Sequence, residues 1–304
     1  MKNFLSIKSC SKEYIESLIS SAEELKVART VGDFGEQPLK NQCWGIIFSK
    51  ASTRTRLSFE VGIRELGGSA LFLSPKDLQL GRGEPIKDTA RVMGRMLHGA
   101  IIRNDSQVEV ESFANYSKLP TINALTDVEH PCQIIADLLT IKEINGTWED
   151  KKIVFLGDVN CNVAHSWVWA AEKLGFELIL SGPSSICSPL EYLNKIEGVK
   201  TRYVENPYDA VENADVVYTD VWVSMGMEDL EGERNGQFND YQINNKLISA
   251  AASEVMVMHC LPAYREKEIT DEVFEKNADT IFCQAENRLH AQKSIMKSLV
   301  NDLD

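Results

Sequence analysis

The sequence predicts an α/β protein with two doubly wound domains, each built on a parallel sheet. Three observations predict this fold class. Short apolar runs alternate with segments of helical periodicity, which is typical of parallel strands covered by helices on both faces. The chain has 304 residues, enough for about two domains of common size. The polar stretch NGTWEDK at 145–151 separates two such series.

The first series begins with an amphipathic helix expected at 11–26, for which Ser11 is a suitable N-cap. The strands expected after it are WGIIF (44–48), SALFLS (69–74), GAIIR (99–103) and PTINAL (120–125). The helices expected between and after these strands begin at STRTR (52–56) and then cover 84–97, 107–117 and 131–145.

The second series repeats the alternation. The expected strands are KIVFLGD (152–158), FELILSG (176–182), KTRYV (200–204), DVVYTDV (215–221) and EVMVMHCL (254–261). The expected helices are 163–174 and the final segment 288–300. Each strand is a short buried run, so both sheets should be covered on two faces.

Composition excludes several classes of protein. The net charge of −13, from 45 acidic and 32 basic residues, argues against a nucleic-acid surface. No apolar run reaches the roughly 18 residues that a membrane span needs, and the first residues do not resemble a targeting peptide. We therefore expect a soluble, cytoplasmic protein. The seven cysteines show no metal-ligand spacing, and we expect them to be reduced.

Polar residues gather where strands end, which is where ligands bind in doubly wound folds. STRTR follows the first strand, and Arg103 ends the third strand. A helix N-terminus has free N–H groups and a positive dipole end, and hydroxyl and guanidinium groups add donors. This suits a phosphate or similar oxyanion. The alternative is an ordinary Ser/Thr cap beside surface arginines.

Three further motifs each allow a functional and a structural interpretation. His130 and Gln133, in EHPCQ, lie one helical turn apart and could bind a carbonyl and an NH2 group; a structural histidine is the alternative. DVWVSMG (220–226) leads into a charged loop that suits a lid or a plain solvated loop. Cys260, in HCLPA, is either a buried structural residue or an activated thiol.

Together these motifs resemble the aspartate/ornithine transcarbamylase family, and within it the ornithine type. S-T-R-T-R, H-P-x-Q, D-x-x-x-S-M-G and H-C-L-P appear in family order, and the resemblance extends to AENRLHAQ (285–292). It implies transfer of the carbamoyl group of carbamoyl phosphate to the δ-amine of L-ornithine, which gives L-citrulline and phosphate. It implies no cofactor and no metal.

The resemblance also implies an architecture. Residues 1–145, joined by the C-terminal helix at about 286–304, would bind carbamoyl phosphate, and 146–285 would bind ornithine. Two long helices would join the domains. The assembly would be a homotrimer or a multiple of trimers, in which Gln79 reaches into the neighbouring subunit's site.

Site residues are carried over by matching position. The resemblance implies that carbamoyl phosphate is held by Ser52, Thr53, Arg54, Thr55, Gln79, Arg103, His130, Gln133, Cys260, Leu261 and Arg288. It implies that ornithine is held by Asn162, Asp220, Ser224 and Met225. The catalytic residues would be Arg103, His130, Asp220 and Cys260. One position departs from the family: Cys161 stands where an asparagine is common.

Two other functions remain compatible with these motifs. A related carbamoyltransferase would use another amine, such as an N-acylated ornithine or putrescine, although such relatives generally alter the S-M-G loop. A non-catalytic, anion-binding oligomer on the same scaffold would lose Arg54, His130 or Cys260, and the sequence retains all three.

Overall fold

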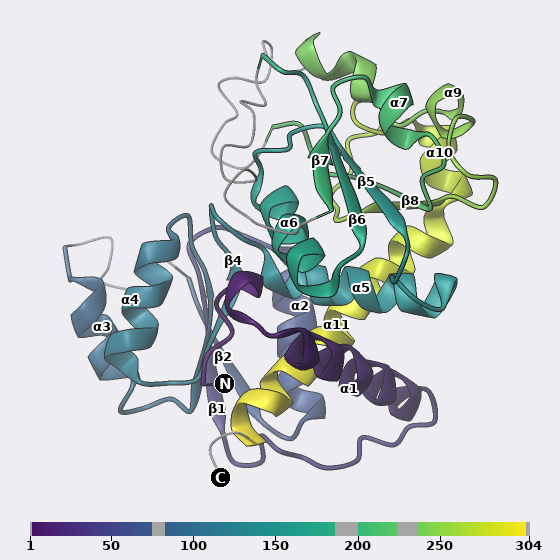
Figure 1. Ribbon diagram of the computed structural model, residues 1–304. Helices are drawn as coiled ribbons and strands as arrows, with labels where there is room; N and C mark the ends of the chain where they lie inside the picture. Colours follow the sequence, from purple (N-terminus) through teal and green to yellow (C-terminus); the bar gives the residue numbers. More distant parts are fainter. Residues whose placement is uncertain (1, 75–82, 186–199, 224–235, 302–304) are drawn as a thin grey trace. The chain divides into compact units, whose positions relative to one another are not determined.

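The computed structural model describes residues 2–74, 83–185, 200–223 and 236–301 (Figure 1). The chain divides into two compact units. Unit 1 comprises Met1–Leu139 and Glu286–Asp304, and unit 2 comprises Thr140–Ala285. No helix among the described residues is long and apolar enough to span a bilayer.

Unit 1 contains a four-stranded, fully parallel sheet with the strand order β2-β1-β3-β4. The order reverses between β1 and β3, so the unit is doubly wound. The strands are β1 (Cys43–Phe48), β2 (Ser69–Leu73), β3 (Gly99–Arg103) and β4 (Thr121–Leu125).

Helices cover both faces of this sheet: α3 and α4 lie on one side, and α1, α2 and the end of α11 lie on the other (Figure 1). Ile47, Ala100 and Ile102 pack with Val110 and Phe113 beneath α3 and α4. Ser11 caps α1, because its side chain accepts a hydrogen bond from the Tyr14 N–H at 3.2 Å. The helices of the unit are η1 (Ile7–Ser9), α1 (Lys12–Thr30), α2 (Thr53–Glu65), α3 (Ile86–Met93) and α4 (Gln107–Ser117).

Unit 2 contains a five-stranded parallel sheet with the order β7-β6-β5-β8-β9. Its core includes a cluster of aromatic rings in which Trp167 packs edge-on against Phe176 and Tyr218, and Tyr218 stacks on Phe155. The strands are β5 (Lys152–Leu156), β6 (Glu177–Ser181), β7 (Thr201–Tyr203), β8 (Val216–Thr219) and β9 (Met256–His259). The helices are α6 (Asn162–Leu174), α7 (Pro207–Val211), η5 (Asn239–Tyr241), α9 (Asn245–Ile248) and α10 (Asp271–Lys276).

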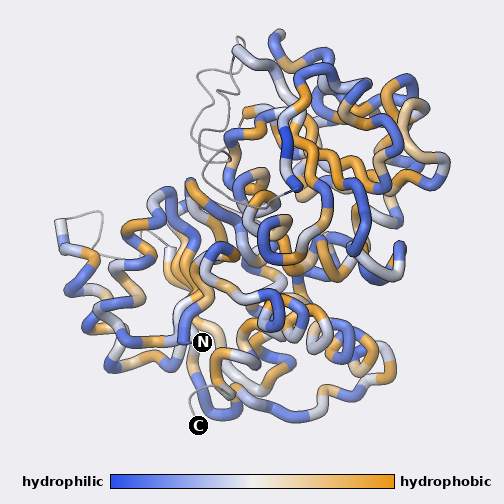
Figure 2. The backbone as a smooth tube through the Cα atoms, viewed as in Figure 1, coloured by the Kyte–Doolittle hydropathy of each residue, from blue (hydrophilic) through white to orange (hydrophobic). Residues whose placement is uncertain are grey.

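Two parallel α/β sheets confirm the predicted fold class. Every strand and long helix expected from the sequence is present, and most ends are shifted by a few residues. The final helix differs more, because it begins at Ala278 and not at the expected 288. Two helices run from one unit into the other: α5 (Pro131–Asn145) and α11 (Ala278–Asn301). Figure 2 shows the reason for the agreement, because hydrophobic stretches coincide with the strands while the helices alternate hydrophilic and hydrophobic positions.

The N-terminal segment adds a short pairing to the β4 edge of the first sheet. The Phe4 N–H donates to the Thr121 carbonyl at 2.9 Å, and the Phe4 carbonyl accepts from the Asn123 N–H at 2.8 Å. Glu129 anchors the next turn: its carboxylate accepts from the Ile7 N–H at 2.8 Å and from the Ser6 hydroxyl. Burial raises the pKa of Glu129 to about 7, although these hydrogen bonds oppose the rise.

We therefore expect Glu129→Gln to stabilise the protein at alkaline pH. Because the folded-state pKa is raised, the unfolded chain releases this proton first, and stability is lost as pH rises from about 4.5 to about 7. Glutamine cannot ionise. The free energy of unfolding of the variant should therefore exceed that of the native chain by about 3 kcal/mol at pH 8 and by little below pH 4.5.

Urea unfolding at the two pH values measures this difference. The exposed Glu24 on α1 offers a control, since Glu24→Gln should leave the pH dependence of the native chain in place. Equal effects of Glu129→Gln at both pH values would contradict the prediction.

Candidate functional site

The start of α2 carries the first group of sequence-predicted residues. Ser52 is its N-cap in extended conformation and makes no capping hydrogen bond through its side chain. Thr53 is the first helical residue, and Thr55 is buried. The first turn contains no acidic residue, so its N–H groups and the helix dipole favour an anion.

Arg103 reaches this helix start from the neighbouring strand. It ends β3 in register with Phe48, the last residue of β1. Its Nη1 donates to the Ser52 hydroxyl at 3.3 Å, and the residue is only 9% exposed. The strand order therefore places a buried guanidinium beside the hydroxyls of the motif.

Arg288 brings a second buried guanidinium from α11. Its Nη1 donates to Gln133 Oε1 at 2.7 Å and lies 3.5 Å from His130 Nε2, while Nη2 donates to Thr55 Oγ1 at 3.4 Å. The chain positions of these residues differ widely, yet unit 1 assembles them at one point. We call Thr55, Arg103, His130, Gln133 and Arg288 the unit 1 cluster.

His130 is a neutral member of this cluster. Burial lowers its pKa well below the usual value, and the charges of Arg288 and Arg103 lower it further. A guanidinium can only donate, so Nε2 accepts from Arg288, and the neutral ring carries its proton on Nδ1. The cluster therefore combines cationic donors with a neutral imidazole, which suits a phosphate joined to a carbonyl group.

Unit 2 brings together Asp220 and Cys260. Asp220 follows β8 and Cys260 follows β9, and the two strands are adjacent, with Thr219 paired to His259. Cys260 Sγ donates to Asp220 Oδ1 at 2.8 Å. Desolvation by the surrounding protein raises the pKa of Asp220, against the opposing effects of His259 and of the Cys260 hydrogen bond.

His259 and Glu268 hold the turn that carries Cys260, and sequence reasoning missed both. His259 Nδ1 accepts from the Leu261 N–H at 2.9 Å, and Nε2 donates to Glu268 Oε1 at 3.0 Å. Leu261 adopts a left-handed φ of 58° and precedes a cis proline. His259 is the first residue of H-C-L-P, so the motif could have indicated it. No motif in the sequence indicated Glu268.

These side chains include a set with metal-ligand donor types. One ligand atom from each of Asp220, His259 and Cys260 lies within 4.8 Å of the others. Both nitrogens of His259 are engaged, however, one by the Leu261 N–H and one by Glu268. Binding a cation there would require His259 to leave one of these hydrogen bonds.

The structure also explains the departure at Cys161. Cys161 is the N-cap of α6, and its Sγ accepts from the Ala164 N–H at 3.4 Å. Burial raises the pKa of this thiol well above its usual value, and the charges of Asp220 and Asp158 add to the effect. The protonated thiol thus takes the capping place that an asparagine side chain would take. Asn162, the next residue, begins α6.

Not every predicted residue can be placed. Gln79, Ser224 and Met225 lie outside the described residues. Arg54 is partly exposed on the first turn of α2. Arg56, the second arginine of STRTR, is turned to other contacts: its Nε donates to Glu60 at 2.8 Å.

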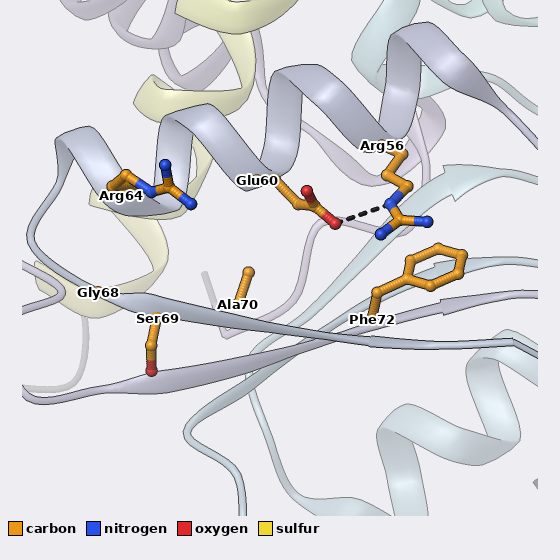
Figure 3. Close-up of a pocket in the computed structure, with 7 residues that line it drawn as sticks. All are labelled: Arg56, Glu60, Arg64, Gly68, Ser69, Ala70 and Phe72. Carbon is orange, nitrogen blue, oxygen red and sulfur yellow. Dashed lines mark hydrogen bonds and ion pairs between the residues drawn. The ribbon is translucent and has the colours of Figure 1, made fainter. Parts of the chain in front are cut away.

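Arg56 lines a separate pocket between α2 and β2 (Figure 3). Its guanidinium carbon lies 3.8 Å from the centroid of the Phe72 ring. The pocket has a volume of about 370 Å³. None of the residues predicted to bind substrate lines it. Its lining comprises Arg56, Glu60, Arg64, Gly68, Ser69, Ala70 and Phe72.

Known proteins resemble the chain over its whole length. Residues 2–143 match the carbamoyl-P binding domain of aspartate/ornithine carbamoyltransferases, and residues 149–299 match the Asp/Orn binding domain. An ornithine carbamoyltransferase of Akkermansia muciniphila is 52% identical over 99% of both chains.

Solved structures of ornithine carbamoyltransferases also resemble this chain. The anabolic ornithine carbamoyltransferase of Campylobacter jejuni is 42% identical, with a TM-score of 0.90 over 99% of this chain and 100% of the other. The Pyrococcus furiosus enzyme is 40% identical, with a TM-score of 0.90 over 97% and 96%. The chain therefore belongs to the aspartate/ornithine carbamoyltransferase family.

Proposed function

We propose that the chain transfers the carbamoyl group of carbamoyl phosphate to the δ-amine of L-ornithine, which gives L-citrulline and phosphate. Its relatives at 52% and 45% identity are named ornithine carbamoyltransferases. The observation that carries the proposal is the unit 1 cluster, in which two buried guanidinium groups and a neutral imidazole meet the start of α2.

Unit 1 binds carbamoyl phosphate in this proposal. Ser52, Thr53, Arg54 and Thr55 hold the phosphate with hydroxyl, guanidinium and N–H donors. Arg103 contacts both the phosphate and the carbonyl oxygen. The Nδ1–H of His130 donates to the carbonyl oxygen. The Gln133 amide oxygen accepts from the carbamoyl N–H. Arg288 closes on the same ligand.

Unit 2 binds ornithine. Asn162 and Asp220 hold the α-carboxylate and α-ammonium groups, together with Ser224 and Met225. Cys260 lies near the δ-amine, and the carbonyl groups around Cys260 and Leu261 accept from the carbamoyl NH2. The 2.8 Å contact between Cys260 and Asp220 supports this assignment, because it holds the thiol and the carboxylate at one point.

The reaction follows from these roles. The neutral δ-amine attacks the carbonyl carbon, a C–N bond forms, and negative charge collects on the carbonyl oxygen. The C–O bond to phosphate then breaks, and the leaving phosphate takes the electron pair and accepts the proton that the amine loses. Fixed donors aimed at the developing charge lower the barrier, each by about 3–4 kcal/mol. Holding both reactants in the orientation for attack lowers the barrier further.

The chain is also proposed to act in the cytoplasm as a homotrimer or a multiple of trimers, with Gln79 completing a neighbouring site. An exposed sheet edge supports self-association. Leu71, on β2, is 46% exposed, and within the described part of the chain no strand pairs with the outer side of β2.

A citrulline assay tests the function. Purified protein is given carbamoyl phosphate with L-ornithine, and in parallel with putrescine, N-acetylornithine or aspartate. Turnover with ornithine alone supports the proposal. Turnover with another amine overturns the unit 2 assignments, and binding of carbamoyl phosphate without turnover favours a non-catalytic oligomer.

Arg54→Gly is expected to weaken binding of inorganic phosphate and carbamoyl phosphate by roughly 10- to 100-fold, since one charge-assisted contact is lost. Arg54 is partly exposed, so folding and assembly should persist. Calorimetry measures the affinities, and size-exclusion chromatography with light scattering measures the assembly. Unchanged affinity would rule out this role for Arg54.

A further inference from the structure

Asp137 is a buried carboxylate beside the unit 1 cluster. It lies on α5, one helical turn after Gln133, and none of its surface is exposed. Its Oδ1 accepts a hydrogen bond from Gln133 Nε2 at 2.7 Å. Burying a carboxylate costs free energy that hydrophobic residues of similar size would not. The carboxylate therefore suggests a function beyond packing.

The two neighbours of the Gln133 side chain leave it one favourable orientation. A glutamine amide has a donor end and an acceptor end of almost the same shape. The carboxylate of Asp137 can only accept, so it selects the NH2 end. The guanidinium of Arg288 can only donate, so it selects the oxygen. A rotated amide would point its NH2 group at Arg288 and its oxygen at Asp137, which disrupts both contacts.

This orientation determines which ligand group can bind. The amide oxygen has two lone pairs, and Arg288 uses one of them. The second can accept from the N–H of a carbamoyl group. A methyl group at the same position, as in an acetyl ligand, offers no donor. With the amide rotated, two donors would face each other and the preference for NH2 would disappear.

We propose that Asp137 is a positioning residue, which fixes the Gln133 amide so that the site selects phosphates bearing a carbamoyl group over those bearing an acetyl group. This inference rests on the proposed function, since it assumes that Gln133 meets the carbamoyl NH2. In this proposal Asp137 does not touch the ligand, and its effect on ligand choice passes through Gln133.

A matched pair of unreactive ligands tests the inference. Phosphonoacetamide carries an NH2 where phosphonoacetone carries a methyl group, and both carry a phosphonate. Calorimetry gives the dissociation constants of both ligands, and of inorganic phosphate, for the native enzyme, Asp137→Ala and Asp137→Asn. We expect the native enzyme to prefer the amide about tenfold, as one hydrogen bond to a buried acceptor allows.

The preference should fall to about twofold in Asp137→Ala, which has no acceptor. Asp137→Asn, which keeps the size and one acceptor but also offers a donor, should lie between. Affinity for inorganic phosphate should change by less than about twofold. A loss of affinity shared equally by all three ligands would show a structural role only. The native preference in every variant that folds overturns the proposal.

A double variant separates positioning from other effects. In Gln133→Ala the preference should already be lost, and adding Asp137→Asn should change it no further, because the two residues act as one unit. A further fall in the double variant would overturn the path through Gln133. An unchanged preference in Gln133→Ala would overturn this inference at its first step, while citrulline formation would still test the proposed function separately.

Discussion

Arg103→Met is expected to lower kcat/KM for carbamoyl phosphate about 10²- to 10³-fold, since it removes a fixed donor aimed at charge that develops in the transition state. Methionine keeps the apolar stem of the side chain, so the 9% exposed position stays filled. The remaining donors still bind the phosphate, so kcat should fall more than ligand affinity. Steady-state citrulline formation with saturating ornithine measures the effect.

The same substitution at an exposed arginine of unit 1, Arg56, provides the control. Arg56 belongs to STRTR, whose Ser52 contacts Arg103, but its guanidinium is paired with Glu60 and packed over Phe72 (Figure 3). Arg56→Met should leave kcat/KM within about twofold of native, as expected when an exposed ion pair is removed. Equal losses in the two variants would mean that net positive charge, rather than the placement of Arg103, supports the reaction.

Asp220→Asn is expected to lower kcat/KM for ornithine about 100-fold or more, because a neutral amide loses the charge that attracts the α-ammonium group. The amide also accepts more weakly from the Cys260 thiol, which in the native chain contacts Asp220 Oδ1 at 2.8 Å. Affinity for carbamoyl phosphate should change by less than about threefold. The proposed binding residues around α2 are untouched, and Asp220 contacts the Cys260 thiol and not the backbone carbonyl groups near it. Initial rates at varied ornithine concentration measure kcat/KM for ornithine, and calorimetry measures the affinity for carbamoyl phosphate.

Asp215 is the matched control for this substitution. It precedes β8, the strand that Asp220 follows, and pairs with Lys151 at 3.1 Å. Asp215→Asn should leave both substrate parameters near native. If Asp220→Asn instead weakened carbamoyl phosphate binding as strongly as ornithine use, the division of substrates between the two units would be wrong.

The strands and long helices could be predicted because each carries its own pattern. A buried strand is a short apolar run, and α1 shows both helical periodicity and a capping serine, Ser11. The short helices α7, α9 and α10 were missed because four to six residues are too few for periodicity. Their N-cap residues could have been predicted from the sequence. Asn206, Asn244 and Thr270 each accept a hydrogen bond from an N–H of the following turn.

Strand ends directed attention to STRTR, Arg103 and Cys260, and the contacts of Arg103 with Ser52 and of Cys260 with Asp220 agree with that reasoning. Arg288 was different. Its place on a long final helix gives no sign that it meets Thr55 and Gln133, and only the family resemblance indicated it. Nor could spacing show that Gln133 and Arg288 bond directly to each other, since that contact depends on tertiary packing.

The last helix affects how the protein is made. Residues 286–301 are translated after the whole of unit 2, yet they supply Arg288 to unit 1. Synthesis proceeds at about 5–20 residues per second, so a nascent unit 1 waits several seconds or more with α2 and Arg103 already synthesised but Arg288 absent. Carbamoyl phosphate stabilises only the form that binds it. The substrate can therefore give its full stabilisation only after α11 has emerged from the ribosome and docked.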